Sequence, residues 1–125
     1  MPDYDRTFRP PAPVVAVTLG PPTTAAQSAP IRAKLDTGAD ATVIPSAVVA
    51  ELGLTPKGYV WARSFDGSFS RRPIYYAAMQ VEGIELPAVR CIAADRETAL
   101  LGRNVLNRFF IALDGKNLTF TLTDR

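Results

Sequence analysis

Short β-type runs separated by tight-turn dipeptides extend along most of this chain and limit what it can fold into. Asp66-Gly67 and Asp114-Gly115 each lie between two strand-like runs. Asp-Gly in that setting favours a hairpin, because glycine adopts the positive φ that the tightest turns require. Residues 118–122 alternate apolar side chains with threonine, which is typical of a strand with one buried face. The pattern predicts a small all-β domain with short helices near residues 47–52 and 103–109.

The length of 125 residues indicates one domain. Residues 1–13 contain four prolines and are expected to form an extended arm, so that the domain proper spans residues 14–125. Ser46 is expected to cap a short helix that stops at Gly53. Pro87 cannot donate a backbone hydrogen bond and is expected to place its strand at a sheet edge.

The absence of histidine excludes several kinds of catalytic site. Ser–His and Cys–His catalysis both require an imidazole, and zinc sites are built largely from histidine and cysteine. The single cysteine, Cys91, lies in an apolar stretch and is expected to be a buried small side chain. Acid–base chemistry is left to carboxylates, lysine and tyrosine, and neither a metal nor another cofactor is expected.

Charge and hydropathy narrow the expected partners. The net charge is +2, and the arginines are scattered instead of forming a basic stripe with interleaved aromatics, so no nucleic-acid partner is expected. No apolar run approaches the roughly 20 residues of a membrane helix. Residues 1–5 are polar and acidic, unlike a signal peptide. These features lead us to expect a cytoplasmic protein with no membrane partner.

Asp36 is the residue with the strongest chemical signal. It follows a half-exposed strand, residues 31–35, and begins the tripeptide Asp-Thr-Gly. Asp-Xaa-Gly is common in ordinary turns, but here Leu35 and Ala39 flank the turn and favour its burial, which is costly for a charge without a purpose or partner. With the later triplet at residues 100–102, the pattern favours a carboxylate that activates water to attack a peptide bond. The chain has one such motif, so a second would come from another chain.

The two motifs resemble those of the retropepsins, the retroviral-type family of aspartic proteases. The matching segments are residues 35–43, Leu-Asp-Thr-Gly-Ala-Asp-Ala-Thr-Val, and residues 100–106, Leu-Leu-Gly-Arg-Asn-Val-Leu. The resemblance extends over roughly residues 14–122 and implies an all-β closed or partly open barrel of the acid-protease type. Retropepsins are homodimers in which each subunit gives one Asp-Thr-Gly to a shared site. The resemblance therefore implies a homodimeric aspartic endopeptidase that acts on protein or peptide substrates.

The resemblance also assigns roles to residues of the first motif. Asp36 would be the catalytic aspartate, and the hydroxyl of Thr37 would bond across the dimer and stiffen the two active-site loops. The carbonyl of Gly38 would meet the substrate backbone. Ala39 and Asp40 would contribute to substrate binding, with Asp40 holding the substrate main chain.

Two further elements complete the expected site. Arg103 matches an arginine that forms a structural ion pair with Asp40. The hairpin tip resembles the flap that closes over substrate and contributes Phe65, Asp66, Gly67 and Ser68.

The chain departs from viral retropepsins in two places. Viral flaps are richer in glycine at the tip, whereas residues 65–69 contain one glycine. The C-terminus adds a full hairpin, as in the retropepsin-like domains of cellular proteins, which implies a dimer interface built from residues 110–122 instead of interleaved termini. A non-catalytic dimerisation or peptide-binding module with the same fold is the alternative. A metal site at Asp36 and Asp40 is a weaker one, because two carboxylates under-coordinate a hard cation.

Overall fold

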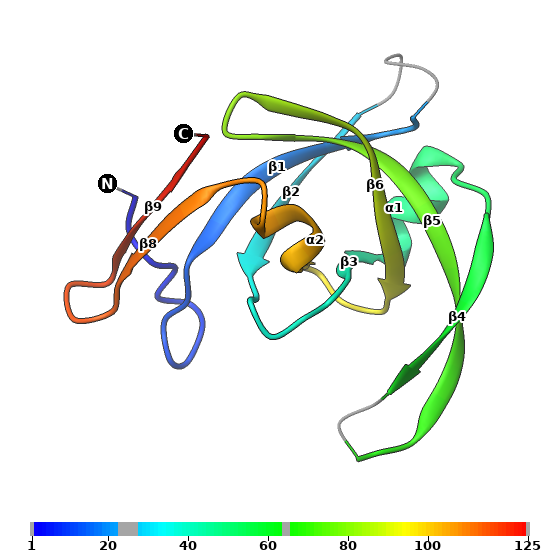
Figure 1. The fold of residues 1–125 in the computed structure, drawn as a ribbon, viewed down its shortest axis with the longest axis horizontal. Helices are drawn as coiled ribbons and strands as arrows, with labels where there is room; N and C mark the ends of the chain where they lie inside the picture. The colour runs from blue at the N-terminus through cyan, green and yellow to red at the C-terminus, as the bar shows by residue number, and fades with distance from the viewer. Residues whose placement is uncertain (1, 23–27, 64–65, 125) are drawn as a thin grey trace.

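The computed structural model describes residues 2–22, 28–63 and 66–124 (Figure 1). No helix within these ranges combines the length and the apolar character needed to cross a bilayer. In chain order, the elements are β1 Val14–Gly20, β2 Ala29–Leu35, β3 Thr42–Pro45, α1 Ser46–Leu52, β4 Gly58–Arg63, β5 Phe69–Val81, β6 Ile84–Ala94, β7 Ala99–Leu101, α2 Arg103–Leu106, β8 Phe110–Asp114 and β9 Thr119–Thr123.

Six of the strands close into a barrel. The main sheet has the order β1-β2-β7-β3-β6-β5-β4, and β1 also pairs with β5, from Val17 opposite Val81 to Gly20 opposite Ala78. Closure satisfies the backbone groups that would otherwise line two open sheet edges. β4 stays outside this ring and pairs with the outer half of β5, and the two project from the barrel as a long hairpin (Figure 1). The predicted all-β barrel with short helices is confirmed.

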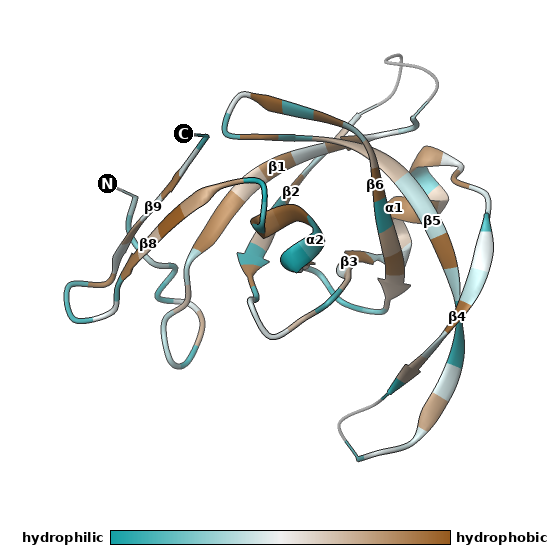
Figure 2. Ribbon diagram, in the orientation of Figure 1, coloured by the Kyte–Doolittle hydropathy of each residue, from teal (hydrophilic) through white to brown (hydrophobic). Residues whose placement is uncertain are grey.

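Alternate residues of the barrel strands fill its interior. Val15, Val17 and Leu19 of β1 are buried, and apolar residues dominate β1 in Figure 2 while the turn between β8 and β9 is hydrophilic. Cys91 of β6 is fully buried, and burial raises the pKa of its thiol to about 12. The thiol is therefore protonated at neutral pH and is a core side chain, as predicted.

Local turn chemistry follows the sequence only in part. In the turn between β8 and β9, the positive φ belongs to Leu118, at 57°, and not to Gly115. Gly53 ends α1 with a φ of 64°, as expected for a glycine stop. Ser46 is not the cap of α1: Pro45 occupies that position, and no side chain caps the helix. The reason is that Pro45 still pairs with Ala94 in the sheet, so the helix begins directly after the strand.

Pro87 lies at a defect of the sheet. β6 pairs with β3 only over Cys91–Ala94, so Pro87 lies outside that ladder. On the other side, the β5–β6 register shifts between Ala77 and Met79, opposite the segment that contains Pro87. A residue without an N–H is tolerated at such a bulge. The proline therefore marks an irregular, one-sided stretch of a strand whose C-terminal half is interior.

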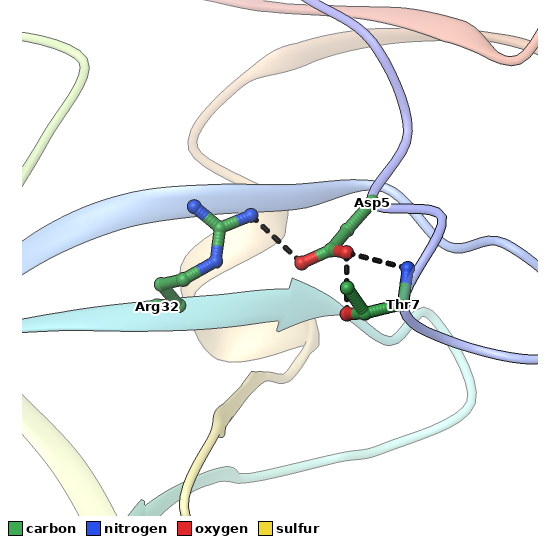
Figure 3. Close-up of polar contacts among 3 residues, drawn as sticks. All are labelled: Asp5, Thr7 and Arg32. Carbon is green, nitrogen blue, oxygen red and sulfur yellow. Dashed lines mark hydrogen bonds and ion pairs between the residues drawn. The ribbon is translucent and has the colours of Figure 1, made fainter.

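The N-terminal arm is bound to the domain. Asp5 accepts hydrogen bonds from Arg32 Nη2 of β2 at 2.9 Å and from the N–H of Thr7 at 2.8 Å (Figure 3). The Thr7 hydroxyl, then its N–H, lower the pKa of Asp5. Tyr4 packs against the core and places its ring 6.2 Å from that of Phe120. The sequence predicted an extended arm, but residues 6–10 turn the chain back, so that Asp5 and Ala12 form an antiparallel bridge. The aromatic residue of the arm belongs to the packed surface.

Candidate active site

The loop that follows β2 carries Asp36 at the end of two parallel strands. Leu35 of β2 lies opposite Leu101 of β7, and both are buried. The Asp36 N–H donates to the Leu101 carbonyl at 3.0 Å, which extends the parallel pairing by one bond. The chain then turns, and the Ala39 N–H donates back to the Asp36 carbonyl at 3.2 Å. The backbone of Asp36 is therefore fixed while its side chain is half-buried.

The Asp36 carboxylate accepts a hydrogen bond from its own turn. The Gly38 N–H donates to Asp36 Oδ1 at 3.0 Å, and a Cβ at Gly38 would lie 3.3 Å from that oxygen. Glycine thus lets the backbone approach the carboxylate closely. Thr37 and Gly38 are exposed, so the carboxylate lies at an open surface of this chain. A lone carboxylate here can take a proton from water, but it cannot at the same time donate one to a carbonyl.

Arg103, the first residue of α2, holds the loop at three points. Its backbone N–H donates to the Ala39 carbonyl at 2.8 Å, and Nη1 donates to the Thr37 carbonyl at 2.7 Å. Nη2 forms the expected ion pair with Asp40. The side chains of Arg103 and Asp40 are 45 % and 89 % exposed, so the pair is solvated in this chain. The loop turns Asp40 outward, so the pair contributes little desolvated charge.

A buried polar network lies beneath the same loop. Thr42 is fully buried, and its hydroxyl donates to Asn104 Oδ1 at 2.8 Å while accepting the Gly102 N–H at 3.1 Å. Asn104 Nδ2 donates to the Arg90 carbonyl at 2.9 Å. These bonds tie the start of β3 to α2 and β6. The sequence motifs assign no role to Thr42 or Asn104, although a threonine inside the apolar run that follows Asp-Thr-Gly requires a buried partner.

Gly102 explains the triplet before α2. A Cβ at this position would lie 2.5 Å from both the carbonyl carbon and the oxygen of Ala41. Only glycine lets α2 approach the end of the active-site loop this closely. The constraint is steric, because the backbone of Gly102 is extended, with φ −81° and ψ 178°.

The predicted flap residues lie at the tip of a hairpin. Asp66, Gly67 and Ser68 form the turn between β4 and β5, which extends beyond the barrel (Figure 1). Ser68 donates its hydroxyl at 2.7 Å and its N–H at 3.0 Å to Asp66 Oδ1, and these two bonds lower the pKa of Asp66. Phe65 lies outside the described residues. The bonds described at this tip are therefore internal to the hairpin.

No group of three or more histidine, cysteine, aspartate or glutamate side chains gathers in the described ranges in a way that could hold a metal ion. Asp40 is turned to Arg103. Of the two carboxylates considered for a cation, one is thus engaged with a guanidinium.

Comparisons with known proteins agree with this geometry. The family model described as "gag-polyprotein putative aspartyl protease" matches residues 23–108. No curated protein sequence matches the chain. Among solved structures, a retropepsin-like aspartic protease from Rickettsia conorii superposes with a TM-score of 0.59 at 17% identity, covering 88% of this chain and 89% of that one.

Two viral enzymes have similar folds. Simian foamy virus (mac) protease gives a TM-score of 0.57 at 17% identity, over 75% of this chain and 91% of that chain. EIAV protease, solved with the inhibitor HBY-793, gives 0.51 at 22% identity, over 77% and 86%. At these identities the structural likeness concerns the fold, whereas the family model covers both motifs that form the loop. The chain belongs to the retropepsin-like aspartyl protease family.

Proposed function

We propose that this chain is an aspartic endopeptidase that acts as a homodimer, each copy giving one Asp36 to a water-activating pair. The observation that supports this most is the construction of the Asp36 loop. Its backbone is held by β7 and α2 through hydrogen bonds of 2.7–3.0 Å to Leu101 and Arg103, while the carboxylate remains at an open surface. Such rigid placement of one reactive group is what a catalytic site requires.

The mechanism follows from placing two such carboxylates together. Two carboxyl groups a few ångströms apart do not both ionise cheaply and share one proton, as known from the dyads of aspartic proteases. The ionised carboxylate takes a proton from water, and the water oxygen attacks the peptide carbonyl. The protonated partner donates its hydrogen bond to the developing oxyanion. Proton transfer to the leaving nitrogen then breaks the C–N bond and restores the shared proton.

The β4–β5 hairpin supplies a surface for the peptide. Strand alternation and register place Tyr59, Trp61 and Phe69 on one face of this hairpin, and their side chains are 55%, 68% and 61% exposed. Aromatic rings at this exposure are unusual for a surface strand unless they bind something. We infer that this face contacts apolar side chains of the substrate when the hairpin closes. The same surface would serve a non-catalytic peptide-binding module, which is the second candidate function.

The Asp36→Asn variant separates the two candidates. Asparagine keeps the oxygen that accepts the Gly38 N–H but cannot take a proton from water, so cleavage of a peptide library should fall at least about 10²–10⁴-fold. The matched control is Asp95→Asn, an exposed aspartate outside the site, which should cleave at the wild-type rate. A peptide isostere with a hydroxyl at the scissile position should inhibit the wild type. Cleavage retained by pure Asp36→Asn, or no cleavage by the wild type, would overturn the proposal.

A further inference from the structure

Lys34 lies just before the active-site loop and on the same face of the sheet as Asp36. In β2, Ala33 and Leu35 face the core and are buried, so Lys34 points to the opposite face. The Asp36 N–H continues the pairing of β2 with β7, and strand alternation returns the Asp36 side chain to the face of Lys34, roughly 7 Å along the strand. A peptide whose scissile bond lies at Asp36 would therefore bring a neighbouring side chain to Lys34.

The neighbours of Lys34 across the sheet are apolar. Lys34 pairs with Leu100 of β7, and Leu100 pairs in turn with Val43 of β3. Paired residues point to the same face, and all three are half-buried, whereas the side chains of the core face are buried. Together they form an apolar row that ends in one ammonium group. Such a row suits a side chain with a methylene stem and an anionic end, because apolar surface receives the stem and the polar group fixes the orientation.

The N-terminal arm covers the same face of β2. Arg32, which alternates with Lys34, donates to Asp5 of the arm at 2.9 Å (Figure 3). The centroid of the Phe8 ring lies 5.4 Å from Lys34 Nζ, a cation–π distance that holds the ammonium over the ring. The arm therefore follows β2 from Arg32 to Lys34, towards Asp36. It precedes the range that the family model matches, so these contacts come from a segment outside that model.

The charge in this region is positive and is not neutralised by the chain itself. The loop of the arm, residues 6–10, carries Arg6 and Arg9, and both are exposed. Within the described ranges, neither of these arginines nor Lys34 takes part in a salt bridge, and the carboxylate of the arm, Asp5, is already paired with Arg32. Unpaired cations attract anionic ligands to the surface that carries them. The arm loop and Lys34 can therefore receive an incoming carboxylate.

We propose that Lys34 and the arm loop form a cationic subsite beside Asp36, which selects peptides with an aspartate or glutamate next to the scissile bond. This inference rests on the proposed function, because Asp36 fixes where the scissile bond lies. Lys34 Nζ donates to the substrate carboxylate, and Phe8 is a positioning residue that holds this ammonium in place. The apolar row of Leu100 and Val43 receives the methylene groups of the same substrate side chain.

Cleavage of two peptide libraries tests the subsite. The libraries consist of apolar peptides and differ only in one central position, which holds glutamate in one and glutamine in the other. Cleavage beside that position should have a kcat/KM at least about fivefold higher for glutamate, the equivalent of one charge pair. In Lys34→Met, which keeps the side-chain length but removes the charge, this preference should disappear, and in Phe8→Leu it should shrink. Lys116→Met, at an exposed lysine between β8 and β9, should keep the wild-type preference. Each ratio is measured on one preparation, so a partly unfolded variant leaves it unchanged.

Binding to an inactive variant separates the subsite from the enzymatic proposal. Asp36→Asn should bind the immobilised glutamate library more tightly than the glutamine library, and adding Lys34→Met should abolish the difference. Binding that depends on Lys34, in a chain whose wild type cleaves nothing, would leave the subsite standing and overturn the proposed function. An active wild type without a preference for glutamate, or with a preference that Lys34→Met leaves unchanged, would overturn the subsite. A chain that neither cleaves nor binds either library would overturn both.

Discussion

The active-site loop and the β4–β5 hairpin are both tight turns begun by an aspartate, yet they are held in opposite ways. Asp36 and Asp66 each accept the N–H of the residue two positions later, at 3.0 Å. The Asp36 loop is also bonded to Leu101 and Arg103, more than 60 residues farther along the chain. The bonds described at the hairpin tip are local, between Asp66 and Ser68 and between Ser70 and Arg72.

This difference teaches where each region takes its rigidity. Hydrogen bonds to β7 and α2 hold the Asp36 loop, so the loop moves only if these elements move with it. The hairpin relies on its own strand ladder and extends away from the core, which makes it the region able to open and close at low cost. Matched substitutions in the two regions should therefore have unequal effects.

The largest effect is expected for glycine substitutions. Gly102→Ala would place a Cβ 2.5 Å from the Ala41 carbonyl and should lower the free energy of unfolding by about 3 kcal/mol or more. Gly67→Ala meets nothing within 4 Å, and its cost comes from a φ of +88°, about 1–2 kcal/mol. Urea denaturation of both variants checks the order. An equal or larger loss of stability for Gly67→Ala would show that the contact between Gly102 and Ala41 is less close than the structure indicates.

The second-largest loss of stability is expected for a substitution in the buried network of Thr42 and Asn104. Thr42→Val keeps the shape but leaves Asn104 Oδ1 and the Gly102 N–H without their partner, at a cost of about 2–3 kcal/mol. Its counterpart in the hairpin is Ser70→Ala, which removes a 3.2 Å bond from Arg72 Nε and should cost no more than about 0.5 kcal/mol. Thermal unfolding of the two variants provides the measurement. If Thr42→Val were neutral, water or a shifted Asn104 would be satisfying these groups.

Arginine substitutions should have smaller effects. Arg103→Ala loses an exposed ion pair, worth about 0–1 kcal/mol, and one bond to the Thr37 carbonyl, worth about 0.5–1.5 kcal/mol. Arg71→Ala loses a guanidinium 4.0 Å from the Tyr59 ring centroid, worth about 0.5–1 kcal/mol. A double-mutant cycle of Arg103→Ala with Asp40→Ala isolates the pair. A coupling well above about 1 kcal/mol would mean that the pair is buried in the working protein.

The smallest effect is expected for the stability of the hairpin turn at acidic pH. Hydrogen bonds from Ser68 lower the pKa of Asp66 below the ordinary value of 3.8. The stabilisation of the hairpin turn is therefore complete above pH 3.8 and is lost as the pH falls through the lower folded value. The protection of the Ser68 amide against hydrogen exchange, taken relative to the intrinsic exchange rate at each pH, should be lost only in that acidic range. In Asp66→Asn this acidic step should be absent, and a step that persists would assign it to another group.

Much of the site was predictable because it is built from two short contiguous sequence motifs. The tripeptide Asp-Thr-Gly at the end of a strand identifies the active-site loop from the sequence. The segment Leu-Leu-Gly-Arg-Asn identifies the start of α2, which holds that loop, and its glycine is required by a close backbone contact. The hairpins around Asp66-Gly67 and Asp114-Gly115 were also predictable, since local backbone preference favours a tight turn there, although in the second turn the positive φ belongs to Leu118. The role of Thr42 was missed because a buried hydroxyl looks like any strand threonine until its partner, 62 residues away, is placed.

The sequence by itself thus determined the all-β class, the turns and the chemical identity of the Asp36 loop, because these depend on neighbours along the chain. Tertiary structure alone decided that β1 closes the barrel on β5, that Arg103 and Asp40 meet at an exposed surface, and that the arm lies on β9. Each of these pairs segments far apart in sequence, and such pairings are selected by packing and hydrogen bonding across the whole fold, which no local pattern records.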